Sequence, residues 1–233
     1  MADIHSLDNP IWNSLTTSHA GFALGSGLAR RYPTAIGPLS GIAEESDAAC
    51  DDLRTLAGPG GILVLFLPRP FSPREGWTLV REGPLTQMIC LDPPSAANAL
   101  LQSGATMRTL TASDVPAMVA LAELTEPGPF RERTHELGLF LGIFEDDRLV
   151  SMAGQRTRSP GFVEVSAVCT HPDARGKGYA RTLMLAVMDD IRRGGATSYL
   201  HAWAHNHSAI RVYRDLGFIH RHTLHVAALR NDR

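Results

Sequence analysis

A short loop combines glycines with cationic side chains in a pattern that suits a phosphate group. Residues 175–180 read Arg-Gly-Lys-Gly-Tyr-Ala, and Lys177 is the only lysine of the 233-residue chain. The apolar spacing that follows predicts that a helix begins at Ala180, and backbone N–H groups at a helix N-terminus bind phosphate. Alternating glycines let the backbone approach a ligand closely. The candidate ligand-binding residues of this loop are Arg175, Gly176, Lys177, Gly178, Tyr179, Ala180 and Arg181.

Two common phosphate-binding motifs do not fit this loop. A Walker loop requires Ser or Thr after its Gly-Lys pair, whereas Gly178 follows Lys177, and no glycine lies five residues before Gly176. A dinucleotide fingerprint requires a third glycine three residues after the second, and Arg181 occupies that position. The sequence therefore excludes the P-loop and the Rossmann loop.

The loop resembles the signature of another superfamily. Arg-x-x-Gly-x-Ala at 175–180 is similar to the (Gln/Arg)-x-x-Gly-x-(Gly/Ala) motif of the GNAT N-acetyltransferases, which binds the pyrophosphate of coenzyme A. Val-Cys-Thr-His-Pro at 168–172 resembles the end of the family's fourth strand. Asn-x-x-Ala-x-x-x-Tyr-x-x-x-Gly-Phe at 206–218 resembles its downstream signature. The resemblance covers about residues 109–229 and is most specific to the FR47-like branch.

This resemblance implies an α/β (α+β) fold with a mixed, mostly antiparallel sheet flanked by helices, and acetyl-CoA as co-substrate. The family's fourth and fifth strands part, which places the gap here between residues 162–170 and 199–205. The acyl thioester would lie in that gap, with the pantetheine arm along the backbone of Val168, Cys169 and Thr170. Asn206 would bind the amide region of the cofactor.

Acyl transfer to an amine requires a neutral amine and a proton for the departing thiolate. Tyr213 matches the family's proton donor, and a phenol is protonated at neutral pH. Two residues are candidates for the base. Glu164 matches the strand-four glutamate of the family's histone acetyltransferases, and His201 stands where its ribosomal-protein acetyltransferases have a strand-five glutamate. The sequence does not choose between Glu164 and His201.

The function implied is transfer of the acetyl group of acetyl-CoA to a primary amine, by direct attack in a ternary complex. The acceptor is expected to be a small molecule or a peptide, and Phe130 and Thr134 to line its site. One alternative is an N-acyltransferase that uses a longer acyl-CoA and an amino acid acceptor. Another is a coenzyme A binding regulator without catalysis.

These residues must be positioned by the elements of the C-terminal part. Turn residues and apolar alternation predict strands at 139–145, 149–156 and 162–170, followed by the glycine loop. The elements predicted around these are a helix from Asp114 to about residue 125, a short helix at 134–137, a long helix from 180 to 193, a strand at 199–205, a helix at 208–216 and a last strand at 218–229.

The first part of the chain carries no motif for coenzyme A. We expect a linker at residues 91–104, which divides an N-terminal α/β domain (1–105) from the acetyltransferase domain (106–233). A helix at 47–57 and strands at 61–67, 77–80 and 85–90 are predicted in this first domain. Two interpretations of this domain stay open: a degenerate copy of the GNAT fold, or an unrelated dimerisation or substrate-covering module.

Composition limits the possible partners and locations. The formal net charge of −2 gives no reason to expect nucleic acid or a membrane as partner. The chain has no secretory leader pattern and no apolar run long enough for a membrane span, so we expect a cytoplasmic protein. Its three cysteines form no CxxC pair, and neither they nor the histidines predict a metal site.

Overall fold

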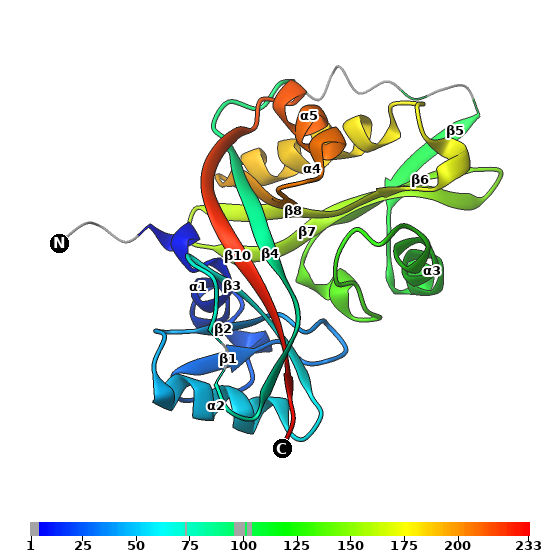
Figure 1. The fold of residues 1–233 in the computed structure, drawn as a ribbon. Coiled ribbons are helices and arrows are strands. Elements are labelled where there is room, and N and C mark those ends of the chain that lie inside the picture. Colours follow the sequence, from blue (N-terminus) through cyan, green and yellow to red (C-terminus); the bar gives the residue numbers. More distant parts are fainter. Residues whose placement is uncertain (1–4, 73, 96–100, 102–103) are drawn as a thin grey trace.

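The computed structural model describes residues 5–72, 74–95, 101 and 104–233. Over these residues the chain forms one eight-stranded sheet, a small two-stranded sheet and helices packed against them (Figure 1). The small sheet contains β1 (Ala29–Arg31) and β2 (Ser40–Ile42), and the large sheet contains β3 (Ile62–Leu67), β4 (Trp77–Cys90), β5 (Ala105–Thr109), β6 (Phe140–Glu145), β7 (Arg148–Ser159), β8 (Phe162–Thr170), β9 (Thr197–Trp203) and β10 (Ile219–Asn231). The α-helices are α1 (Pro10–Thr16), α2 (Asp47–Ala57), α3 (Val115–Thr125), α4 (Tyr179–Arg193) and α5 (His207–Asp215).

The large sheet has the order β3-β10-β4-β9-β8-β7-β6-β5. Every neighbouring pair is antiparallel except β8 with β9. This confirms the mixed, mostly antiparallel sheet flanked by helices. Strands β3 and β4, from the N-terminal part, lie on either side of β10, from the C-terminal end. Both parts of the chain therefore build the same sheet, while the domain boundary near residue 105 stays a prediction.

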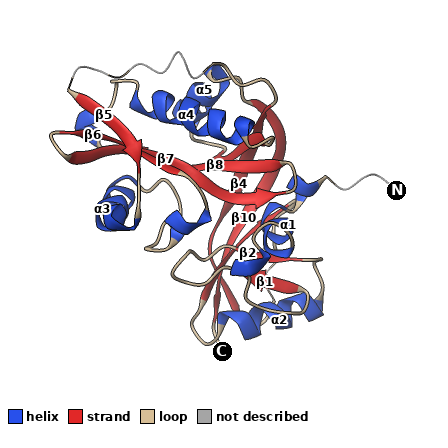
Figure 2. Ribbon diagram, turned by 180° about the vertical axis from the view of Figure 1, so that it is seen from behind, coloured by secondary structure: helices blue, strands red, loops and turns tan. Residues whose placement is uncertain are grey.

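Helices cover the two faces of the sheet at β7 and β8. The apolar stripe of α4 packs with α5 on one face, and α3 packs on the opposite face (Figure 2). The stripe predicted from the 3, 4, 3, 4 spacing is buried in full, and it consists of Leu183, Met184, Val187, Met188 and Ile191. Gly178, in the left-handed conformation, is the N-cap of α4, and Gly194 is its C-cap.

The N-terminal helices pack on opposite sides of β3. Val64 and Phe66 cluster with Ile11 of α1, whereas Leu63 and Leu65 cluster with α2. The strand is thus buried on both faces, as its continuous apolar run predicts. Among the described residues, no helix combines the length and the apolar character that a membrane span needs.

The sequence-based predictions differ from the structure in several elements. The strands expected at 77–80 and 85–90 are one strand, β4, because Gly83 and Pro84 stay paired with β10. Pro84 is tolerated there because β9 pairs with β4 only from Leu85 onward. Residues 134–137 form a 3₁₀ turn. Edge strand β5 and the elements α1, β1 and β2 were not predicted. Within the expected linker, residues 96–100 and 102–103 lie outside the described residues.

Candidate active site

The parallel strands at the centre of the sheet part half-way along their length. β8 and β9 pair over three residues, the last being Glu164 opposite Tyr199. Beyond this point β8 continues against β7, and β9 continues against β4 as far as Trp203. The predicted gap between residues 162–170 and 199–205 is therefore present. Along it, β8 offers a backbone edge with no pairing strand among the described residues.

A β-bulge shapes β8 beside this gap. Ser166 pairs with Gly154 and Cys169 with Met152, so β8 contains one residue more than β7 between these pairs. Ala167 has a φ of 53°, the left-handed conformation that non-glycine residues rarely adopt. A bulge locally reorients the backbone of its strand. Here it turns the peptide groups that follow Ala167, in the segment predicted to meet the thioester.

In the segment predicted to hold the pantetheine arm, the side chains make contacts inside the protein. Cys169 is buried under α3, and the hydroxyl of Thr170 lies 2.8 Å from that of Ser151. Val168 packs, partly buried, against the core beneath α4. Any contact of these three residues with a ligand would therefore be made mainly by their backbone, as the prediction states.

The glycine loop lies directly before α4. Gly176 and Gly178 have φ values of 78° and 82°, and a Cβ added at either would meet, chain neighbours apart, no heavy atom of the described residues within 4 Å. Gly178 is the N-cap of α4, so the free N–H groups of the first helical turn face the open side of the loop. Arg175 and Arg181 are exposed beside it, and the Arg181 guanidinium donates to the carbonyl of Asp215 at 3.3 Å. The arrangement suits an anionic ligand.

Lys177 and Tyr179 share a carboxylate partner within the protein. The Lys177 ammonium lies 2.7 and 3.0 Å from the oxygens of Glu145, at the end of β6. The hydroxyl of Tyr179, a buried residue, donates to the same carboxylate at 2.5 Å. Hydrogen bonds from Lys177 and then Tyr179 lower the pKa of Glu145, and the bond to Glu145 raises the pKa of Tyr179 to about 12. Glu145 thus fixes the loop to the sheet.

Helix α5 carries two predicted site residues. Asn206 is its N-cap, and the side-chain oxygen accepts from the backbone N–H of Ala209 at 3.2 Å. This leaves the Asn206 amide NH₂ as the group able to contact a cofactor. Tyr213 is partly buried against Phe218, with ring centroids 6.3 Å apart, and burial raises its pKa to about 12. Its hydroxyl makes no hydrogen bond to a described residue, so it is a protonated and available donor.

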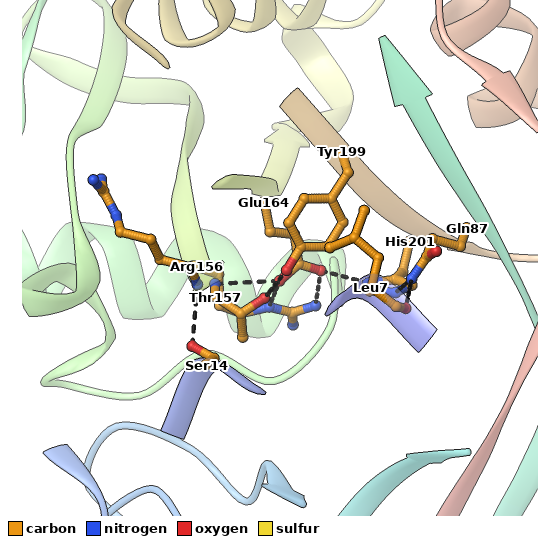
Figure 3. Close-up of polar contacts among 9 residues, drawn as sticks. Leu7, Ser14, Gln87, Arg156, Thr157, Glu164, Tyr199 and His201 are labelled. Atoms are coloured by element: carbon orange, nitrogen blue, oxygen red, sulfur yellow. Dashed lines mark hydrogen bonds and ion pairs between the residues drawn. The ribbon is translucent and has the colours of Figure 1, made fainter. Parts of the chain in front are cut away.

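The two base candidates contact one another. Glu164 is fully buried, and its carboxylate accepts two hydrogen bonds from Arg156 at 2.7 and 2.9 Å (Figure 3). It also accepts from the Thr157 hydroxyl at 2.7 Å and contacts His201 Nδ1 at 2.7 Å. Burial alone would raise the pKa of this carboxyl, but the Arg156 charge and the His201 contact more than offset burial and hold the pKa well below its ordinary value of 4.5. Glu164 is consequently a poor proton acceptor.

The hydrogen bonds around His201 define its tautomer. Nε2 lies 3.0 Å from the Gln87 amide nitrogen, which also donates to the carbonyl of Leu7 at 2.9 Å (Figure 3). The Gln87 oxygen accepts from Arg221, so the contacts with Leu7 and with Arg221 independently define the orientation of the Gln87 amide. His201 therefore carries its proton on Nδ1, toward Glu164, and its lone pair on Nε2. A carboxylate that orients a neutral histidine in this way is a familiar arrangement for a general base.

The predicted acceptor-site residues are both buried. Phe130 packs edge-on against Phe140, and Thr134 is 2% exposed. The Thr134 hydroxyl accepts from the N–H of Arg131 and donates to the carbonyl of Ile36, both at 2.7 Å. The hydroxyl of Thr134 thus connects the α3–β6 segment to the N-terminal part, which leaves it no free donor for a substrate.

The comparisons with known proteins agree with this geometry. The family model described as FR47-like protein matches residues 140–226. A solved structure from Novosphingobium aromaticivorans DSM 12444, described as a GNAT-family acetyltransferase, is 38% identical; the similarity covers 99% of this chain and 100% of that one, with a TM-score of 0.86. The chain belongs to the GNAT family. It is an acyltransferase of GNAT type, and the similarity includes the N-terminal part.

Two further GNAT relatives show how far the similarity extends. A mycothiol acetyltransferase from Saccharopolyspora erythraea is 30% identical over 161 residues, which are 62% of this chain but 53% of that protein. The chain thus matches about half the length of this curated relative. A GCN5-related N-acetyltransferase from Sphaerobacter thermophilus shares the fold, with 19% identity, a TM-score of 0.52 and coverage of 82% and 71% of the two chains.

Several residues of this GNAT site were not predicted from the sequence. They are Gln87, Arg156, Thr157 and Tyr199. For Arg156 a signal was present, because a turn centred on Pro160 places residue 156 opposite Glu164 across the β7–β8 hairpin. For Gln87 the sequence held no such signal, because β4 of the N-terminal part meets β9 of the C-terminal part only through long-range strand pairing.

The glycine loop gives a first prediction. Gly178→Glu should weaken acetyl-CoA binding by about 100-fold, because it places a carboxylate next to the predicted pyrophosphate position. Calorimetry measures this change. Gly161→Glu, at the β7–β8 turn, is the matched control, because Gly161 has a φ of 78° and equally open surroundings. An equal loss in both variants would show that backbone strain, not charge at the loop, causes the effect.

Proposed function

We propose that this GNAT protein transfers the acetyl group of acetyl-CoA to a primary amine by direct attack in a ternary complex. The parting of β8 and β9 beyond Glu164 carries this proposal. An unpaired, bulged strand edge lies between the glycine loop before α4, which we propose binds the pyrophosphate, and the His201–Glu164 pair. A cofactor with its pyrophosphate on the loop would extend its pantetheine arm along β8 toward that pair.

Residues of the chain then supply the base, the oxyanion stabilisation and the proton donor. His201 takes the proton of the amine at Nε2, because Glu164 is saturated with hydrogen bonds and serves to orient the imidazole. The side chain of Gln87 must turn away from Nε2 as the amine binds, since catalytic hydrogen bonds often form only in the substrate complex. Peptide N–H groups after the bulge at Ala167 stabilise the oxyanion. Tyr213 donates the proton to the coenzyme A thiolate.

Tyr213→Phe tests this assignment. The variant should bind acetyl-CoA as the wild type does, but its kcat should be about 100-fold lower, a typical rate contribution of one proton-transfer group. Because the pKa of Tyr213 is about 12, the wild-type rate should show no alkaline decline from this group in the ordinary assay range. Thiol release and calorimetry supply the two readouts. An unchanged kcat in Tyr213→Phe would remove Tyr213 from the mechanism.

A further inference from the structure

The Arg156 guanidinium has one side that the Glu164 pair does not use. Its Nε and Nη2 donate to the two oxygens of Glu164, and the residue is 8% exposed. Nη1 makes no hydrogen bond to a described residue, and the Arg156 side chain retains 9% exposure. A largely buried guanidinium whose NH₂ group has no hydrogen-bond partner is a strong donor for an anion.

The space beside Nη1 is left open by a glycine of the α3–β6 segment. A Cβ added at Gly128 would lie 3.9 Å from Nη1 and, chain neighbours apart, would meet no other heavy atom of the described residues within 4 Å. Gly128 has a φ of 125°, so this position also favours glycine for its backbone. Any larger side chain here would begin to fill the space in front of Nη1.

The Arg156 guanidinium lies close to the proposed base. The Phe66 ring lies 6.0 Å from the Arg156 guanidinium carbon and 5.0 Å from the His201 ring. Glu164 contacts both Arg156 and His201, and it is the last β8 residue paired before the gap. The Phe66 ring therefore lies close to both the Arg156 guanidinium and the His201 ring.

We propose that the acceptor amine carries a carboxylate, which binds Nη1 of Arg156 while its amino group approaches His201. This rests on the proposed function. A carboxylate is favoured over a neutral carbonyl because charge-assisted hydrogen bonds are about twice as strong as neutral ones. Glu164 already accepts from Nε and Nη2, so the two N–H groups of Nη1 are left for a ligand, and Phe66 would pack against the carbon chain between the two polar ends.

Matched acceptors test the proposal on the intact enzyme. Amino acids of different spacing between amine and carboxylate are compared with their carboxamides, at a pH where both amines are neutral. For at least one pair, kcat/KM of the carboxylate form should exceed that of the amide by about 10-fold or more, the size expected for one buried charged hydrogen bond. Equal rates within every pair would overturn the proposal while leaving the acetyltransferase function intact.

Two isosteric variants make the test specific to Nη1. Gly128→Asp and Gly128→Asn impose the same backbone strain, but only the aspartate places a carboxylate beside Arg156. Gly128→Asp should abolish the preference for carboxylate acceptors and Gly128→Asn should retain it, with acetyl-CoA affinity equal in both. The same selectivity in both variants would overturn the proposal. If acetyl-CoA binds but no amine of any class is acetylated, the proposed function fails and the inference fails with it.

Discussion

Arg156→Met should lower the free energy of unfolding by about 3–5 kcal/mol, because it leaves the buried Glu164 carboxylate without its cation. Both side chains are almost fully buried, at 9% and 1% exposure, and their closest approach is 2.7 Å. The loss of such a partner is far more costly than the loss of a surface ion pair. Denaturant titration of the wild type and the variant measures the difference.

Arg192→Met is the matched control for this prediction. Arg192 pairs with Asp189 at the same distance of 2.7 Å, but the arginine is 59% exposed. Its replacement should cost less than about 1 kcal/mol, because solvent screens the pair. Similar losses in Arg156→Met and Arg192→Met would contradict the account of a buried charge network.

The stability cost of Arg156→Met should depend on pH. In the wild type the pKa of Glu164 lies below its ordinary value of 4.5, so its stabilising contribution is present above about pH 4.5 and decreases as the pH falls toward the folded-state pKa. Without Arg156, burial favours the neutral carboxyl. The difference between the two proteins should therefore be largest at neutral pH and shrink in acid. A difference that does not change with pH would point to lost packing instead.

His201→Ala should lower kcat by about 100- to 10,000-fold, the range typical of a lost general base. The expected cause is loss of the Nε2 lone pair, so added imidazole should restore part of the rate by occupying the vacated space. Steady-state kinetics measure both effects, and calorimetry with acetyl-CoA reports whether the cofactor site is intact.

His205→Ala controls for the loss of a neighbouring imidazole. His205 is exposed at the end of β9 and stacks on Trp203, with ring centroids 5.8 Å apart. This variant should keep near wild-type kcat. A rate in His201→Ala close to that of His205→Ala, or a loss without any imidazole rescue, would assign His201 a structural role and leave the base unidentified.

Local patterns in the sequence were sufficient to predict the elements around the site. The stripe from Leu183 to Ile191 predicts α4, and the alternating glycines at 176 and 178 predict the loop before it, because both patterns depend on residues close together in the chain. The gap between β8 and β9 was expected from the GNAT resemblance, and β8 has the predicted bounds, Phe162–Thr170. These features position the candidate site.

Long-range pairing explains what was not predicted. The insertion of β10 between β3 and β4 joins residues from the two ends of the chain, and no local period encodes such a partner. The same pairing brings Gln87 to His201, and Leu7 to Gln87. Thr134 was predicted to meet the substrate because it follows an irregular loop, but its hydroxyl bonds to Ile36, a contact that depends on tertiary structure.

The most direct test of the central claim is to follow acetyl-CoA, free thiol and N-acetyl product together while the amine is varied. The account predicts that thiol appears only when an amine is present, in a one-to-one ratio with the acetylated amine, and with the intersecting kinetics of a ternary complex. Release of thiol without amine, parallel kinetics of an acetyl-enzyme, or bound acetyl-CoA that no amine consumes would contradict it.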